Sequence, residues 1–181
     1  MAERAAAVRD AGAVKFGFEQ RWTAPVDDIM STYLDEAFWK GLDSSSFSKM
    51  APPEVLDLER DDAAGTALVR LRYKVDADLP AQAARFIDPN DVAWVQETRW
   101  DLSARTADVR FLPVQAASLI RATAGIVVQE DGADTVRELR GEFKVRIPLV
   151  GSKVEKAVVG DIGTNLDEEA DAVARYLGLP D

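Results

Sequence analysis

The sequence predicts an α+β fold in which an antiparallel sheet of about six or seven strands packs on one long C-terminal helix. Apolar residues recur at helical spacing through the last thirty residues, a period that no other stretch sustains. Between residues 14 and 147 several short runs alternate apolar and polar residues, as strands with one wet face do. Strand and helix patterns do not alternate along the chain, which argues against a parallel sheet.

The C-terminal helix is predicted from an apolar stripe that continues over seven or eight turns. The stripe consists of Val150, Val154, Val158, Ile162, Leu166, Ala170, Val173 and Leu177. Pro148 suits an early helical position, and Gly178 followed by Pro180 ends the helix. A helix of nearly thirty residues is about 40 Å long, so it needs a broad surface to lie on, and the strands offer one.

Two features of this helix call for interpretation. The acidic run Asp167 to Asp171 is expected to form its exposed face. Gly160 and Gly163 lie inside the helical pattern, where each costs about 1 kcal/mol relative to alanine. The simpler interpretation of the glycines is close packing against the sheet or a local kink. The alternative is that Gly163 leaves volume for a ligand.

The other elements are short. One or two helices are predicted over 23–41, and a helix-like stretch over 81–87. Strands are predicted over 14–22, 55–58, 66–75, 92–100, 106–114, 118–129 and 135–147. Residues 1–12 are expected to be a flexible segment, and residues 13–181 a single domain.

The composition narrows the function classes. The chain has no cysteine and no histidine, so disulfides, thiolate metal sites and histidine proton shuttles are unavailable. We expect no metal, no cofactor and a cytoplasmic location. The net charge of −10 argues against nucleic-acid binding and electrostatic membrane binding. Neither a signal peptide core nor a membrane span is apparent, so no stable membrane insertion is expected.

No catalytic constellation stands out, and no residue is assigned as catalytic. Phosphate loops and Gly-rich dinucleotide turns are missing. The acidic pairs Asp27-Asp28 and Asp61-Asp62 fit a helix start and a turn better than a calcium loop. Three arginines could hold a ligand carboxylate or phosphate, although surface salt bridges explain them more simply. They are Arg85, Arg121 and Arg146.

The order of elements resembles the helix-grip fold of the START-related and polyketide-cyclase-like (SRPBCC) superfamily. Two phrases, DLPAQAARFIDPNDVAWVQETRW and FKVRIPLVGSKVEKAVVGDI, are similar to its uncharacterised branch, domain of unknown function 2505. The matching residues are Leu79-Pro80, Arg85, Trp100, Ile147-Pro148, Gly151 and Glu155. The resemblance implies a curved sheet and a cavity between sheet and helix that takes apolar small molecules. It implies no assigned reaction.

Large aromatic residues share the strand faces with a few polar ones, which suits either a packed core or a small-molecule site. The candidate cavity-lining residues are Phe18, Gln20, Tyr73, Trp94, Gln96, Thr98, Trp100, Phe143, Val158, Ile162, Gly163 and Leu166. We expect the protein to bind or transport a hydrophobic small molecule or lipid. Two alternatives remain open: a cyclase- or aromatase-like enzyme using the same cavity, and a structural domain with a filled core.

Overall fold

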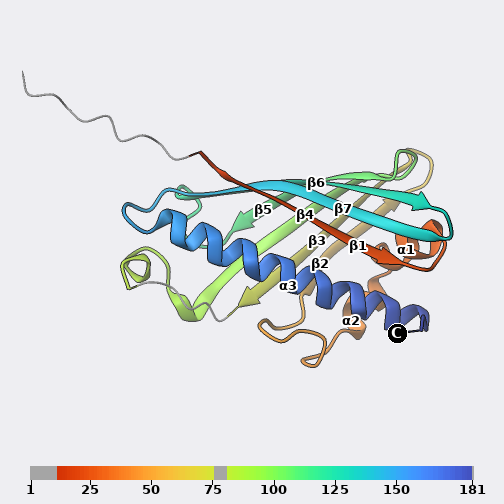
Figure 1. The fold of residues 1–181 in the computed structure, drawn as a ribbon, viewed down its shortest axis with the longest axis horizontal. Coiled ribbons are helices and arrows are strands. Elements are labelled where there is room, and N and C mark those ends of the chain that lie inside the picture. The colour runs from red at the N-terminus through yellow and green to blue at the C-terminus, as the bar shows by residue number, and fades with distance from the viewer. Residues whose placement is uncertain (1–11, 76–80, 181) are drawn as a thin grey trace, which may run out of the picture.

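The computed structural model describes residues 12–75 and 81–180. The described elements follow the predicted order (Figure 1). They are β1 (Val14–Trp22), α1 (Val26–Tyr33), α2 (Glu36–Gly41), β2 (Glu54–Asp61), β3 (Thr66–Val75), the 3-10 turns η1 (Ala83–Arg85) and η2 (Pro89–Asp91), β4 (Val92–Asp101), β5 (Thr106–Pro113), β6 (Ile120–Asp131), β7 (Asp134–Val145) and α3 (Gly151–Leu177).

Within the described ranges, seven strands form one antiparallel sheet in the order β1-β7-β6-β5-β4-β3-β2. Strands β2 to β7 form a meander in which each strand pairs with the next along the chain. β1 instead pairs with β7, more than a hundred residues away in sequence. The α+β prediction and the antiparallel sheet are confirmed.

The helix α3 runs diagonally along one side of the curved sheet and packs chiefly on β1 and β7 (Figure 1). It has 27 residues and begins at Gly151, after a turn that contains Pro148. Gly178 ends it with a left-handed φ of 66°, and its N–H donates to the Arg175 carbonyl at 3.1 Å. The long terminal helix is therefore confirmed. No described helix is both long and apolar enough to cross a membrane.

The core lies between the sheet, α1, α2 and α3, which contributes Val154 near its start and Ala172 and Val173 near its end. Edge-to-face aromatic contacts link α2 to α1 and to α3: the ring centroids of Tyr33 and Phe38 are 6.3 Å apart, and those of Phe38 and Tyr176 are 5.4 Å apart. The Trp39 indole Nε1 donates to the Tyr33 carbonyl at 3.0 Å. This end of the molecule is closed by large buried side chains.

Several local predictions change in detail. The helix-like stretch 81–87 is the short 3-10 turn η1, and η2 follows it before β4. β2 extends beyond the predicted 55–58, β6 begins and ends two residues later than predicted, and β7 begins one residue and ends two residues earlier than predicted. Asp27 and Asp28 occupy the first turn of α1, as predicted. The flexible segment expected over 1–12 lies almost entirely outside the described residues.

Candidate functional site

A buried polar cluster joins β1, β7 and α3. Gln20 and Arg137 are paired in register, and both face the interior with 4% and 3% of their surface exposed. Arg137 Nη1 donates to Glu169 Oε1 on α3 at 2.8 Å, and Arg137 Nε donates to Gln20 Oε1 at 3.2 Å. Glu169 is itself only 6% exposed. The cluster is a buried ion pair with an amide beside it.

Two aromatic rings enclose the guanidinium of Arg137. Its Cζ lies 4.4 Å from the centroid of the Tyr33 ring and 5.8 Å from that of Trp22. The Trp22 indole Nε1 donates to the Ala170 carbonyl at 3.0 Å, next to Glu169. Cation–π attraction therefore adds to the ion pair, and both contribute to holding α1 and α3 against the sheet.

Both interior tyrosines are held in the protonated form. Burial raises the pKa of Tyr33 well above its usual value, the charge of Arg137 opposes this and that of Glu169 adds to it. Burial also raises the pKa of Tyr73 well above its usual value, again with Glu169 adding and Arg137 opposing. Near neutral pH both hydroxyls are therefore neutral hydrogen-bond donors.

Several buried polar atoms of the cluster have no hydrogen-bond partner among the described residues. They are Gln20 Nε2, Arg137 Nη2 and the Tyr33 hydroxyl. The Glu169 carboxylate raises the pKa of Tyr33 both by its charge and as a hydrogen-bond partner, although the hydroxyl does not meet the geometry of a well-formed hydrogen bond to it. Buried polar groups are normally paired, so these atoms require an explanation.

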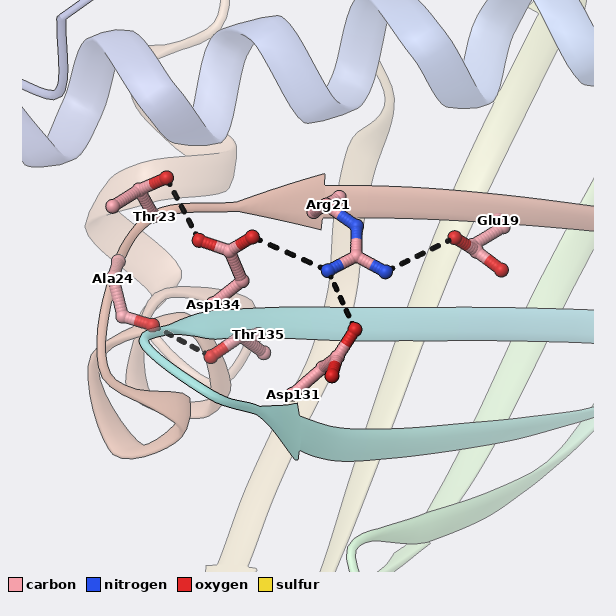
Figure 2. Close-up of polar contacts among 7 residues, drawn as sticks. All are labelled: Glu19, Arg21, Thr23, Ala24, Asp131, Asp134 and Thr135. Atoms are coloured by element: carbon pink, nitrogen blue, oxygen red, sulfur yellow. Dashed lines mark hydrogen bonds and ion pairs between the residues drawn. The ribbon is translucent and has the colours of Figure 1, made fainter.

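A polar network on the surface fixes the register of β1 on β7 (Figure 2). Arg21 Nη1 donates to Asp131 and Asp134 at 2.8 and 3.2 Å, which ties β1 to the hairpin between β6 and β7. Thr23 donates to Asp134 at 2.9 Å, and this bond followed by Arg21 lowers the pKa of Asp134. Thr135, which is fully buried and not on the surface, donates to the Ala24 carbonyl at 2.7 Å. The same register brings Gln20 opposite Arg137.

Six of the predicted cavity-lining residues are half-buried: Phe18, Trp94, Gln96, Val158, Ile162 and Leu166. Trp94 and Gln96 share the inner face of β4. The rings of Trp94 and Tyr73 are stacked, with their centroids 5.2 Å apart and an interplanar angle of 11°. Gln96 lies directly opposite Phe111 of β5, which is also half-buried. Gln96 Nε2 donates to Thr98 Oγ1 at 3.5 Å. We call Phe18, Trp94, Phe111, Val158, Ile162 and Leu166 the inner apolar surface, and Gln96 is the polar residue beside it.

The other predicted residues are buried: Gln20, Tyr73, Thr98, Trp100, Phe143 and Gly163. A Cβ added to Gly163 would lie 2.6 Å from Phe18 Cε1, so the missing side chain makes room for the Phe18 ring. Gly163 therefore fits the simpler of the two interpretations, in which the glycine allows α3 to pack closely against the sheet. The three candidate arginines Arg85, Arg121 and Arg146 are exposed and do not join the buried cluster.

The sequence interpretation missed Arg137, Glu169 and Tyr33 as polar groups of the interior. The prediction that the acidic run is an exposed face is wrong for Glu169, although Asp167 and Asp171 are exposed. The signal was present: Glu169 follows Leu166 by three residues and precedes Val173 by four, so it lies on the apolar stripe. Arg137 likewise occupies an inner position in the alternation of β7.

An outer hollow of about 510 Å³ lies on the face of the sheet away from α3. Charged side chains of Arg99, Asp101, Asp108, Glu138 and Arg140 line much of it. Because five of its eleven lining residues carry a charge, this hollow suits a hydrophobic ligand less well than the inner face of the sheet does. Apart from Trp100, none of the predicted site residues lines it.

A curved antiparallel sheet with a long C-terminal helix across it, and short helices after the first strand, defines a helix-grip protein of the α+β class. The chain belongs to the family described as Protein of unknown function (DUF2505), whose model matches residues 18–177. The family resemblance seen in the sequence is confirmed. No curated protein matches the chain.

Solved structures share the fold at low sequence identity. The protein TTHA0849 from Thermus thermophilus has a TM-score of 0.64 at 18% identity, covering 90% of this chain and 99% of that one. The Zhui aromatase/cyclase from Streptomyces sp. R1128 has a TM-score of 0.60 at 16% identity, covering 91% and 93%. A START superfamily protein from Mycobacterium smegmatis has a TM-score of 0.54 at 14% identity, covering 90% and 95%. At these identities the likeness concerns the fold alone.

Proposed function

We propose that the protein binds or transports a hydrophobic small molecule or lipid between the sheet and α3. The observation that supports this most is the inner apolar surface. Trp94 and Phe111 are large, face the side of the sheet that carries α3, and are nevertheless only half-buried. Phe18 and Leu166 are half-buried in the same way. Burying such surface with a ligand is favourable by roughly 25 cal/mol per Å² before binding costs.

The fold neighbours are consistent with a small-molecule site. Their names include an aromatase/cyclase, a START superfamily protein and a norcoclaurine synthase. Small-molecule sites in proteins combine a mainly apolar wall with a few polar groups, and the inner apolar surface with Gln96 has that composition. The lack of cysteine is consistent with a cytoplasmic protein.

Binding without chemistry fits the interior better than catalysis. A proton-transfer group works best with a pKa near the operating pH, whereas burial moves the pKa of Tyr33 and Tyr73 further above it. Glu169, the acid of the buried cluster, is ion-paired with Arg137 at 2.8 Å. A purely structural domain would fill its interior, and the half-buried aromatic residues argue against that.

The proposal is tested with the neutral fluorescent probe N-phenyl-1-naphthylamine, whose emission rises in an apolar site. We expect saturable binding, and we expect Val158→Trp on the inner apolar surface to weaken it by about tenfold. Thr164→Trp is the matched control, because Thr164 lies on the same helix and is exposed. Equal affinity of both folded variants, or no saturable binding to the native chain, would overturn the proposal.

A further inference from the structure

The atoms without partners in the buried cluster share one chemical property. Gln20 Nε2 and Arg137 Nη2 can only donate a hydrogen bond, and the Tyr33 hydroxyl donates when protonated. All three side chains are at least nine-tenths buried. Burying a donor without an acceptor is costly, so the cluster is complementary to an oxygen atom that accepts.

The charge of the cluster specifies what kind of oxygen fits. The guanidinium of Arg137 is already neutralised by Glu169 at 2.8 Å, so the pair carries no net charge. A carboxylate or phosphate added beside it would leave a buried negative charge without a counterion. An uncharged acceptor, such as a ketone, ester or ether oxygen, takes the hydrogen bonds without that cost.

The cluster lies next to the inner apolar surface. Asn165 is one helical turn before Glu169 on α3, and its buried Oδ1 also has no partner among the described residues. Leu166 of the inner apolar surface follows directly in sequence. On the sheet, Tyr73 stacks on Trp94. It is also close enough to Glu169 and Arg137 for both charges to shift its pKa. A ligand on the apolar surface can therefore direct one end toward the cluster.

We propose that the ligand is an apolar molecule with an uncharged oxygen acceptor, which Arg137, Gln20 and Tyr33 bind by hydrogen bonds. The inference rests on the proposed function and deepens it by naming the ligand class. The donors come from β7, β1 and α1, three separate elements. The acceptor is therefore held at a fixed point in the fold, with the apolar body of the ligand extending along the sheet.

Three probes of nearly equal size separate this inference from the proposed function. They are 2-acetylnaphthalene with a ketone, 2-ethylnaphthalene without an acceptor, and 2-naphthoate with a carboxylate. On the full-length native protein near neutral pH, we expect the ketone to bind about tenfold more tightly than either of the others. Equal binding of all three would overturn the inference and leave the proposed function standing. Binding of none would overturn both.

Tyr33→Phe identifies the donors, because it removes one hydroxyl and keeps the ring beside Arg137. We expect the variant to lose about half or more of the ketone's advantage while its affinity for 2-ethylnaphthalene is unchanged. Gln20→Met is the second variant, and Tyr176→Phe, at an exposed tyrosine, is the control. If ordered water alone satisfies these donors, the ketone has no advantage in any variant, and that result overturns the inference.

Discussion

Glu155 shows how one side chain joins the sheet to the helix. It is 3% exposed, and its Oε1 accepts a hydrogen bond from the Val145 N–H at the end of β7 at 2.8 Å. Gly151, at the start of α3, lies so close to the Val145 carbonyl that a Cβ would collide with it. Both residues belong to the phrase that carries the family resemblance, and the structure gives them a positioning role.

Glu155→Leu should lower the free energy of unfolding by about 1–3 kcal/mol, because it leaves the Val145 N–H buried without an acceptor. Glu155→Gln keeps an acceptor oxygen, so we expect it to stay within about 1 kcal/mol of the native chain. Urea denaturation of the two variants measures this. Equal losses in both would show that the hydrogen bond is not what stabilises the junction.

The burial of Tyr33 and Tyr73 should make the folded protein less stable at alkaline pH. Their pKa values in the folded chain are raised above the ordinary value of 10.0. The unfolded chain therefore releases their protons first, so their contribution is complete below about pH 10 and declines as pH rises further. Absorbance at 295 nm in a Tyr176→Phe background, which leaves only these two tyrosines, should show little tyrosinate at about pH 10.5 when folded and most of it when denatured.

A different titration result would contradict this prediction. If the folded Tyr176→Phe chain ionises both tyrosines with a midpoint near pH 10, the two hydroxyls are open to water and are not held as buried donors.

At the scale of elements, the two interior glycines of α3 have different roles. Apart from the neighbouring backbone of its own helix, no described atom lies within 4 Å of a Cβ built at Gly160, whereas one built at Gly163 meets the Phe18 ring. Alanine favours helix over glycine by about 1 kcal/mol. Gly160→Ala should therefore stabilise the protein by up to that amount. Gly163→Ala should destabilise it by about 1–3 kcal/mol, because Phe18 must move.

The variants Gly160→Ala and Gly163→Ala control for each other, because both substitutions make the same chemical change in the same helix. Thermal unfolding of the two variants gives the comparison. A gain in stability from Gly163→Ala as large as that from Gly160→Ala would contradict the close packing of α3 on β1.

The ion pair between β7 and α3 makes a further prediction. Arg137→Leu leaves the Glu169 carboxylate buried without its partner, and we expect a loss of about 3–5 kcal/mol. Adding Glu169→Leu removes that stranded charge, so the double variant should recover much of the loss. Denaturant unfolding of both variants measures this. A double variant less stable than Arg137→Leu would show that the pair itself stabilises the fold strongly.

At the scale of the whole molecule, the sequence was sufficient where a pattern repeats. The stripe from Val150 to Leu177 and the alternation of Val14–Trp22 predicted α3 and β1 nearly residue by residue. The contacts within the buried cluster could not be predicted, although the burial of Glu169 and Arg137 could, because Gln20 and Arg137 become neighbours only through the pairing of β1 with β7. Local spacing carries no information on that pairing. Glu169 was interpreted as exposed because it lies within an acidic run, and only its position on the helical face distinguishes it from its neighbours.

The location of the ligand on the inner apolar surface is the central claim, and methyl NMR tests it most directly. With methyl-labelled isoleucine, leucine and valine, 2-acetylnaphthalene should give saturable shifts at Val158, Ile162 and Leu166. Val127, which lines the outer hollow, and Leu149, which is 96% exposed, should not move. Shifts confined to Val127 or Leu149, or no saturable shift at the α3 methyl groups, would contradict ligand binding between α3 and the sheet.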